Sequence, residues 1–328
     1  MKIVVVTGFL GFIGVHVTRA LLDADFMVYG IDKLTYAANE NLLSEFAEHP
    51  NFDYTIADIK DVKWIPDCDY VINLAAESHV ANSINDSDEF IDSNIVGVKN
   101  LLNLVRMKHA NVNDRPIFFQ MSTDEVYGDI EEDEHTEEDL LRPSNPYSAS
   151  KAAADMLVMA WSRTYGIDYI ILRPTNNYGK HQYPEKLLPI AVKNLMREKP
   201  IVLHNGGTPV RNWLHAADTA NAIRMIIESG TKNEIYNISG GYAQTNKKTV
   251  DRIIEAFNVL RPVEPIFDPD VVPPPSRKKI KYAERQGQDM RYALDDRKLR
   301  TLVGWKPERR FNYEIEEIVR HYMVQYRW

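Results

Sequence analysis

The chain of 328 residues has a single cysteine, Cys68, and few residues of the kinds that mark repetitive chains. One cysteine excludes an internal disulfide and a cysteine-rich zinc module, so we expect no metal site and a reducing, cytoplasmic compartment. Glycine and proline (15 and 17 residues) are too scarce for a collagen-like or low-complexity chain.

The sequence also lacks an excess of positive charge and a long apolar run. Lys and Arg number 39 against 47 Asp and Glu, a net charge of −8. We therefore expect no nucleic-acid partner, because such binding needs a large basic surface. An anionic small molecule remains compatible, since a few cations and backbone N–H groups can hold a phosphate. No apolar run of about 18 residues occurs, so we expect no membrane span.

Short β-branched and aromatic runs alternate with amphipathic segments in the first half of the chain. The runs predict strands at 3–7, 26–32, 54–58, 70–74, 117–122 and 169–173. Apolar residues at helical spacing predict helices at 88–108 and 148–165, the second ending at Gly166. The alternation predicts an α/β fold with a doubly wound, Rossmann-type parallel sheet.

This alternation decays after about residue 175, where prolines become frequent. We expect residues 1–175 to form an NAD-binding Rossmann domain, and residues 176–328 a smaller, irregular α/β substrate lobe interwoven with it. The segment 312–326 is typical of a terminal amphipathic helix. The segment 129–139, with eight acidic residues in eleven, is expected to be a solvated loop.

Three glycines between the first predicted strand and the following helix indicate a dinucleotide site. Gly8, Gly11 and Gly14 allow a tight turn and leave a helix N-terminus open to a pyrophosphate. Asp32 ends the second predicted strand, where a carboxylate can accept both ribose hydroxyls and would repel a 2′-phosphate, which favours NAD. Asp58 and Ile59 follow the third strand, near the expected adenine.

Tyr147 and Lys151 lie four residues apart at the start of a predicted helix, on one face. An ammonium near a phenol stabilises the phenolate, so we expect Lys151 to lower the pKa of Tyr147. The tyrosine could then take a hydroxyl proton while a hydride leaves the same carbon. Together with the glycine loop, the pair predicts oxidation of a substrate alcohol by NAD.

Thr123, Asp124 and Glu125 follow the strand at 117–122, at the edge where an open α/β sheet binds its ligands. Burial and mutual repulsion could separate the pKa values of the two carboxyls. One could then donate a proton to a leaving hydroxyl while the other removes a proton from carbon. The Thr123 hydroxyl is placed to hydrogen-bond the developing carbonyl oxygen.

These segments resemble the nucleoside-diphosphate-glucose 4,6-dehydratases of the extended short-chain dehydrogenase/reductase superfamily. The resemblance spans nearly the whole chain and is carried by residues 7–14, 32–36, 74–80, 122–128, 147–151, 176–179, 184–189, 211–214 and 289–295. Its most specific part is the adjacent Asp124 and Glu125. A 4-epimerase of the same superfamily would need no acid to expel a hydroxyl, and a non-catalytic NAD-sensing module would need neither residue pair.

The resemblance implies a role for each catalytic residue. Tyr147, with Lys151, would deprotonate the glucosyl 4-hydroxyl as the C4 hydride passes to NAD. Glu125 would then remove the C5 proton, and Asp124 would protonate the departing C6 hydroxyl, with Thr123 at the carbonyl. Return of the hydride to C6 and of a proton to C5 would give a 4-keto-6-deoxy sugar nucleotide for deoxysugar biosynthesis, that of rhamnose included.

The resemblance also implies binding residues. Those expected to contact NAD are Gly8, Gly11, Phe12, Ile13, Gly14, Asp32, Lys33, Leu34, Thr35, Asp58, Ile59, Leu74, Ala75, Ala76, Ser93, Tyr147, Lys151 and Asn177. Those expected to contact the sugar, diphosphate or base are Ser78, Thr123, Asn176, Lys186, Leu187, Arg211, Asn246 and Arg285. Arg211 is the expected diphosphate partner, because a guanidinium meets phosphate oxygens bidentately.

Three segments depart from the pattern of the bacterial dTDP-glucose enzymes: 79–83, 178–180 and 285–289. The third lies near the expected base, so thymine and uracil, which differ by one methyl worth about 1 kcal/mol of burial, both remain open. The resemblance further implies a homodimer that pairs through helices near 88–108 and 148–165.

Overall fold

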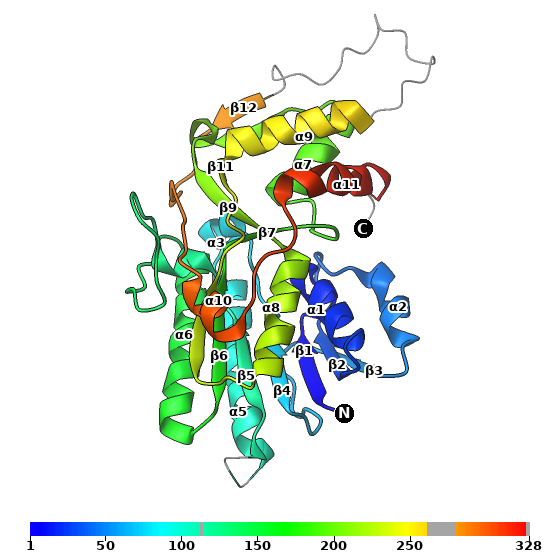
Figure 1. Cartoon of the computed structure of the whole chain (residues 1–328), viewed down its shortest axis with the longest axis vertical. Coiled ribbons are helices and arrows are strands. Elements are labelled where there is room, and N and C mark those ends of the chain that lie inside the picture. Colours follow the sequence, from blue (N-terminus) through cyan, green and yellow to red (C-terminus); the bar gives the residue numbers. More distant parts are fainter. Residues whose placement is uncertain (110, 112–113, 261–279, 326–328) are drawn as a thin grey trace, which may run out of the picture.

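The computed structural model describes residues 1–109, 111, 114–260 and 280–325 (Figure 1). A seven-stranded parallel sheet lies at its centre in the order β10-β6-β5-β4-β1-β2-β3. The strands are β1 (Ile3–Thr7), β2 (Met27–Asp32), β3 (Phe52–Ile56), β4 (Tyr70–Asn73), β5 (Ile117–Met121), β6 (Tyr169–Pro174) and β10 (Glu234–Ile238). The predicted doubly wound sheet is confirmed.

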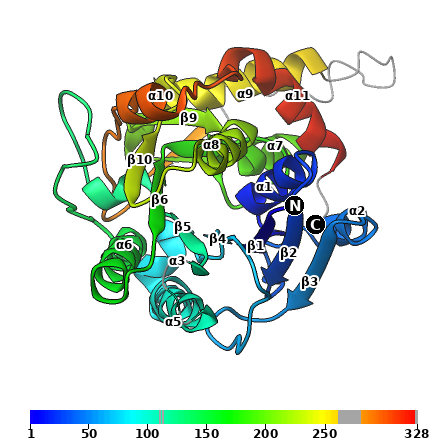
Figure 2. The same ribbon diagram turned by 60° about the horizontal axis from the view of Figure 1, so that its bottom comes forward.

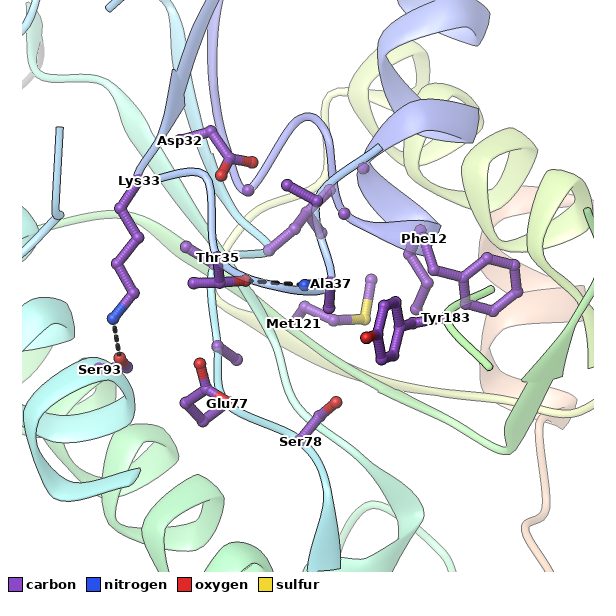
Figure 3. A pocket seen from close by; sticks show the side chains of 18 of the residues that line it. Phe12, Asp32, Lys33, Thr35, Ala37, Glu77, Ser78, Ser93, Met121 and Tyr183 are labelled. Atoms are coloured by element: carbon purple, nitrogen blue, oxygen red, sulfur yellow. Dashed lines mark hydrogen bonds between the residues drawn. The ribbon is translucent and has the colours of Figure 1, made fainter. Parts of the chain in front are cut away.

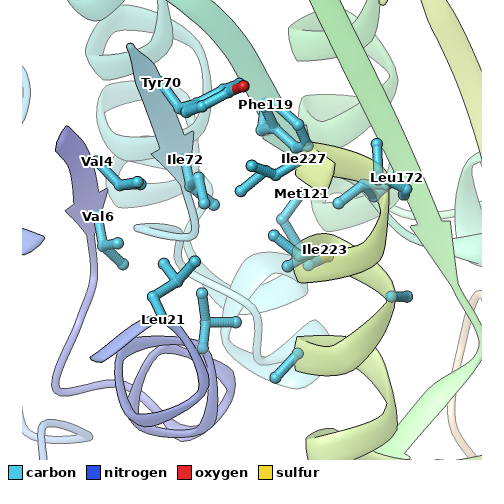
Figure 4. Packing of buried hydrophobic residues seen from close by; sticks show 14 of the residues in the cluster. Val4, Val6, Leu21, Tyr70, Ile72, Phe119, Met121, Leu172, Ile223 and Ile227 are labelled. Atoms are coloured by element: carbon cyan, nitrogen blue, oxygen red, sulfur yellow. The ribbon is translucent and has the colours of Figure 1, made fainter. Parts of the chain in front are cut away.

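Helices cover both faces of this sheet, and the alternation of side chains along β1 shows how. Val4 and Val6 pack with α1 (Phe12–Leu22) and α8 (Ala216–Ser229), as Figure 4 shows. Val5 packs on the other face with α5 (Val98–Lys108) and α6 (Pro146–Tyr165). All three valines are fully buried, which is why the strand is one continuous apolar run rather than an alternating one.

The predicted helix at 88–108 contains a break that periodicity did not indicate. Its parts are α4 (Asp88–Ile91), a π-helical segment η2 (Asp92–Gly97) and α5. The wider turn buries Ser93 and Asn94 against the sheet. The Asn94 side chain accepts from the backbone N–H of Glu77 at 3.0 Å, so the π segment holds the chain after β4 in place. Such π-bulges occur frequently at functional sites.

Helix α6 ends at Gly166 as predicted, but it begins at Pro146, two residues before the expected start at 148. Asn145 and Ser148 form a reciprocal capping box, and Pro146 occupies the first turn, where its missing N–H costs nothing. Gly166 closes the helix in the left-handed region with a φ of 71°. The helix therefore starts at a fixed point directly before Tyr147.

A second lobe, in the upper part of Figure 1, has its own small sheets and core. Strands β7 (Asn176–Tyr178), β9 (Val210–His215) and β11 (Ala243–Thr245) form one sheet, and β8 (Ile201–His204) and β12 (Ile280–Ala283) form another. Helices α7 (Leu187–Met196), α9 (Asn246–Leu260) and α11 (Phe311–Val324) pack around them. The short elements are η1 (Glu40–Leu42), α2 (Leu43–Ala47), α3 (Val80–Asn85), η4 (Asp124–Tyr127), η5 (Asn205–Gly207) and α10 (Arg297–Val303).

The chain returns to the central sheet after residue 176. Strand β10 extends the sheet beside β6, and α8 packs against α1. The two parts are thus interwoven, while the boundary at 175 stays a prediction. Helix α11 matches the predicted terminal helix, except that residue 326 lies outside the described residues, as do the prolines between 261 and 279.

The acidic segment 129–139 differs from the solvated loop expected for it. Its side chains at 131–134 are exposed, but its backbone and one carboxylate dock on the segment 290–295. Asp129 accepts from the backbone N–H groups of Met290 (3.1 Å) and Arg291 (2.7 Å), and the N–H of His135 donates to the carbonyl of Ala293. These hydrogen bonds fix the segment 129–139 to the segment 290–295.

Two kinds of feature are absent from the described part of the chain. No helix there is sufficiently long and apolar to span a bilayer. No group of three or more His, Cys, Asp or Glu side chains there is arranged to hold a metal ion.

Candidate active site

A cavity lies at the carboxyl ends of the sheet strands, between the two lobes (Figure 3). It encloses about 1190 Å³ of space that is partly open to solvent. The predicted site residues that line it are Gly8, Gly11, Phe12, Ile13, Gly14, Asp32, Lys33, Thr35, Asp58, Ile59, Leu74, Ala75, Ala76, Ser78, Ser93, Tyr147, Lys151 and Lys186.

The glycine loop at one wall of this cavity tolerates no side chain at two positions. Gly8 has a φ of +68°, and a Cβ there would lie 2.8 Å from the backbone nitrogen of Ala75. A Cβ on Gly14 would lie 1.9 Å from the carbonyl oxygen of Gly8. Gly11 stands at the N-cap of α1. The loop therefore leaves the first N–H groups of α1 free to meet a pyrophosphate, which the residues present fit.

Asp32 and Lys33, which Figure 3 labels, line the cavity beside the glycine loop. The Asp32 carboxylate accepts from the backbone N–H groups of Leu10 (3.0 Å) and Leu34 (2.9 Å). Burial raises the pKa of this carboxyl, and those hydrogen bonds oppose the rise. The Lys33 ammonium lies 3.3 Å from the Asp58 carboxylate and 3.1 Å from the Ser93 hydroxyl. Lys33 therefore contacts two other residues that are predicted to bind the cofactor.

Asp124 is almost completely buried and lies at the end of β5. Burial, with the nearby charge of Glu125, raises the pKa of this carboxyl to about 7. Its Oδ1 accepts from the Thr123 hydroxyl at 3.1 Å, while its buried Oδ2 has no hydrogen-bond partner. A buried polar atom without a partner usually marks a functional site, and here it is a carboxyl that stays protonated up to neutral pH.

Glu125 lies in a more polar environment than its neighbour. The Asn145 side-chain amide and the Tyr292 hydroxyl donate to its carboxylate at 3.5 and 3.4 Å. Its backbone N–H donates to the Thr123 hydroxyl at 3.3 Å. Two adjacent carboxyls in unlike surroundings can act as an acid and a base at the same pH.

Tyr147 and Lys151 are both buried on the face of α6 that lines the cavity. The expected lowering of the Tyr147 pKa is not found. Burial, with the charges of Glu125 and Asp124, raises the pKa of the phenol, and only a hydrogen bond with Thr123 opposes this. Burial also lowers the pKa of Lys151, to about 8, which weakens the cation that was expected to favour the phenolate.

The remaining predicted residues stand apart from the cavity. Leu34 and Asn177 do not line it; Asn177 accepts from the Thr219 hydroxyl at 2.6 Å instead. Arg211 is buried, donates to the carbonyl of Asp289 at 2.9 Å and lies over the Tyr292 ring at 4.3 Å. The others outside the lining are Thr123, Asp124, Glu125, Asn176, Leu187, Asn246 and Arg285. Their roles stay predictions.

Two of those residues share a feature with Asp124. The Asn176 Oδ1 and the Arg285 Nε are buried without a hydrogen-bond partner, and so are both side-chain polar atoms of Gln244. Gln244 faces Arg211 across the β9–β11 ladder. A polar substrate bound near these atoms would supply the hydrogen-bond partners that they lack.

Sequence reasoning missed several lining residues, among them Glu77, Tyr183 and Glu185. Burial raises the pKa of Glu77, and Glu185 accepts from the Tyr36 hydroxyl at 3.1 Å. Glu77 and Glu185 lie inside the segments 74–80 and 184–189 that carry the resemblance, which could have indicated them. Nothing in the local pattern singles out Tyr183.

Comparison with known proteins decides the family. The family model described as GDP-mannose 4,6 dehydratase matches residues 5–320. The chain belongs to this nucleotide-sugar 4,6-dehydratase family.

A curated relative and solved structures agree with that membership. The dTDP-glucose 4,6-dehydratase of Haemophilus influenzae is 37% identical, over 98% of each chain. The dTDP-glucose 4,6-dehydratase DesIV of Streptomyces venezuelae, solved with NAD bound, is 33% identical with a TM-score of 0.88, over 98% of this chain and 97% of that one. The UDP-N-acetylglucosamine 4-epimerase of Methanobrevibacter ruminantium is 26% identical with a TM-score of 0.84, over 99% of each chain.

Dehydratases and epimerases thus share this nucleotide-sugar fold. The fold alone does not separate the two reactions, so that distinction depends on the residues of the site. In this member of the 4,6-dehydratase family, the relevant residues are Asp124 and Glu125.

Proposed function

We propose that the protein catalyses the NAD-dependent 4,6-dehydration of dTDP-glucose to the 4-keto-6-deoxy sugar nucleotide, as a hydro-lyase. One observation carries the proposal: Asp124, a buried carboxyl with a pKa near 7 and an unpartnered oxygen, stands next to Glu125 in a polar environment. A dehydration needs both an acid for the leaving hydroxyl and a base for carbon. A 4-epimerisation needs neither.

NAD, when bound, supplies the hydride acceptor and a positively charged ring. Gly8, Gly11 and Gly14 would hold its pyrophosphate, and Asp32 its ribose hydroxyls. We assign the Thr123 hydroxyl, which donates to Asp124 in the free protein, as the group that turns to donate to the developing carbonyl once substrate is bound.

The proton transfers are assigned to the side chains that surround this position. Tyr147 takes the proton of the 4-hydroxyl, Glu125 takes the proton of C5, and Asp124 gives its proton to the C6 hydroxyl. The raised pKa of Tyr147 means that the free protein holds a neutral phenol. Added positive charge in the cavity would favour the phenolate.

The base of the sugar nucleotide is proposed to be thymine because the curated relative and DesIV are named as dTDP-glucose enzymes. One observation keeps UDP-glucose as a second candidate. The segment 285–289 departs from the bacterial pattern, and Gln288 stands in it with its amide donating to the carbonyl of Asp289. Turnover of both sugar nucleotides by one preparation tests the choice.

A homodimer and a cytoplasmic location also belong to this proposal. The helices expected at the interface expose apolar side chains, with Ile91 44%, Met107 64% and Met156 48% exposed. Burial raises the pKa of the Cys68 thiol to about 12, in keeping with an unreactive cysteine in a reducing compartment. Sedimentation equilibrium should give twice the chain mass of 37.8 kDa. A monomer would contradict the dimer and leave the proposed chemistry intact. The place in rhamnose or other deoxysugar synthesis stays a prediction.

A further inference from the structure

Behind the proposed catalytic residues lies a buried charged cluster that the mechanism does not use. Asp155 is fully buried on α6, one turn after Lys151. Its Oδ2 accepts from the Arg173 Nε and from the Ser122 hydroxyl, each at 3.0 Å. Arg173, on β6, is only 2% exposed, and its guanidinium also donates to the Tyr127 hydroxyl at 2.7 Å.

The cluster holds both ends of the segment that bears the carboxyl pair. Ser122 directly precedes Thr123, and Tyr127 is the last residue of η4, which carries Asp124 and Glu125. The Tyr127 hydroxyl in turn donates a hydrogen bond to the side-chain oxygen of Asn237 at 2.9 Å. Asp155 and Arg173 therefore connect this segment to α6, the helix of Tyr147 and Lys151.

The same carboxylate acts on the charge of Lys151. Lys151 is 3% exposed, so burial favours its neutral form, and the negative charge of Asp155 opposes that effect. The Oδ1 of Asp155 is buried without a hydrogen-bond partner. Burial raises the pKa of this carboxyl, and the charges of Arg173 and Lys151 and the Ser122 hydrogen bond oppose the rise.

Other charged and titratable groups lie on the elements around this part of α6. Those on η4 and β6 are Asp124, Glu125, Tyr127, Tyr169 and Arg173, of which Tyr127 and Arg173 belong to the cluster. On α4 and η2, Glu89 pairs with Lys33 and Asp92 with Lys60. On α5, Lys108 pairs with Asp67 and Arg106 lies over Tyr165, while the remaining Asp88 and Lys99 are exposed.

We infer that Asp155, held by Arg173 and Ser122, is a positioning residue of the site: it fixes the segment 122–127 against α6 and keeps Lys151 in its ammonium form. The inference rests on the proposed function, in which Lys151 must be charged. It gives the buried Arg173–Asp155 pair a role beyond stability, which such pairs by themselves seldom increase.

The test is a titration of Lys151 in the full chain with Asp155→Asn. The Nζ signal of ¹⁵N-labelled lysine, assigned by its loss in Lys151→Met, should titrate lower than in the wild type by about one pH unit or more, the shift typical of losing a nearby opposite charge. The pH profile of NADH formation from dTDP-glucose should lose its alkaline side by the same amount.

A control is Asp218→Asn, which removes a buried carboxylate from its pair with the exposed Arg309 at 3.3 Å, on a helix away from the cavity. Both variants should lower Tm, but only Asp155→Asn should move the Lys151 titration. An unchanged Lys151 titration in folded Asp155→Asn would overturn the inference.

A lone buried Arg173 charge could prevent folding of Asp155→Asn, since breaking a buried pair is strongly destabilising. The double variant with Arg173→Gln leaves no unpaired charge and is expected to fold and to show the same Lys151 shift. Failure of the wild type to dehydrate either sugar nucleotide would instead contradict the proposed function. The NMR titration does not depend on turnover, so the two failures remain distinct.

Discussion

Asp124 and Glu125 are neighbours in the chain that meet different surroundings. Asp124 is sealed from solvent with one unpartnered oxygen, while Glu125 is half-buried and accepts two side-chain hydrogen bonds. The assignment of Asp124 as the acid and Glu125 as the base follows from this contrast.

Glu125→Gln should separate the two halves of the reaction. Oxidation at C4 should survive, because Tyr147 and Lys151 are untouched, and NADH should accumulate at 340 nm. Elimination should slow by about 10²–10⁴-fold, the usual contribution of a general base. Glu131→Gln, on the exposed part of the acidic segment, is the matched control and should turn over normally. Full turnover by Glu125→Gln would show that another group is the base.

Asp124→Asn should have opposite effects on activity and stability. The native carboxyl has its pKa raised from 3.8 to about 7, so the unfolded chain loses this proton first as pH rises. The stability cost is absent below pH 3.8 and complete above pH 7, where it reaches about 4 kcal/mol at 1.36 kcal/mol per pH unit. The variant should therefore have a higher Tm than the wild type at pH 8, with little difference near pH 4.

The same variant should lose water elimination at every pH, whereas the wild type should lose it as pH rises through 7. Steady-state kcat between pH 5 and 9 checks the activity, and calorimetry the Tm. A lower Tm for Asp124→Asn at pH 8 would contradict the raised pKa.

At the scale of elements, the turn from β1 to α1 depends on close backbone approach. A Cβ added to Gly14 would lie 1.9 Å from the carbonyl oxygen of Gly8, whereas a Cβ added to Gly11 would lie 3.1 Å from the same oxygen. Gly14→Ala should therefore distort the loop and weaken NAD binding far more than Gly11→Ala, which needs a shift of only a few tenths of an ångström. Calorimetric titration of NAD into both variants measures this. Equal affinities would mean that the loop does not hold the cofactor.

Local patterns predicted these elements where one period dominates the sequence. The valines of β1 are all buried, and the apolar stripe of α5 forms its buried face. The strand and the helix that these patterns predict are both confirmed. The π segment η2 was not predicted, because its wider turn follows from the contacts of Asn94 with Glu77 and with Ser150, far away in sequence. The docking of the acidic segment was not predicted for the same reason: its partners lie about 160 residues away.

The candidate site shows the same limit. The residues on strand ends and the glycine loop were predictable because topology brings them to one edge. The direction of the Tyr147 pKa was not, because burial and two carboxylates outweigh a lysine that sequence spacing alone suggested.

At the scale of the whole molecule, four histidines meet where the two lobes join. His16 on α1 has its ring 6.1 Å from His181 and 5.9 Å from His215, and His181 is 5.0 Å from His321 on α11. Burial lowers the pKa of all four, to about 4 for His16 and His321 and about 3 for His181 and His215. The joint therefore holds these rings in their neutral form.

Acid should destabilise this joint. Below pH 6.5 the unfolded chain binds protons that the folded histidines accept only near pH 3–4, so stability falls as pH decreases from 7 toward 4. Tm measured across this range should decline less steeply for His181→Gln than for the wild type. His49→Gln, after α2 and away from the joint, should follow the wild type. Identical slopes for His181→Gln and the wild type would contradict this account.

Acidic and basic groups are unevenly distributed in this molecule. The excess of acid lies partly in the segment 129–139, which ties the segment 290–295 in place. The features proposed to bind anions are the α1 N-terminus and a few buried cations. A chain of net charge −8 can thus be proposed to bind two diphosphates.

The central claim is tested most directly by isotope transfer. The protein is given dTDP-glucose and UDP-glucose, each deuterated at C4, and the products are examined by mass spectrometry and NMR. The account predicts loss of one water with the deuterium at C6, and faster turnover of dTDP-glucose. A product of unchanged mass inverted at C4, or no loss of water from either substrate, would contradict it.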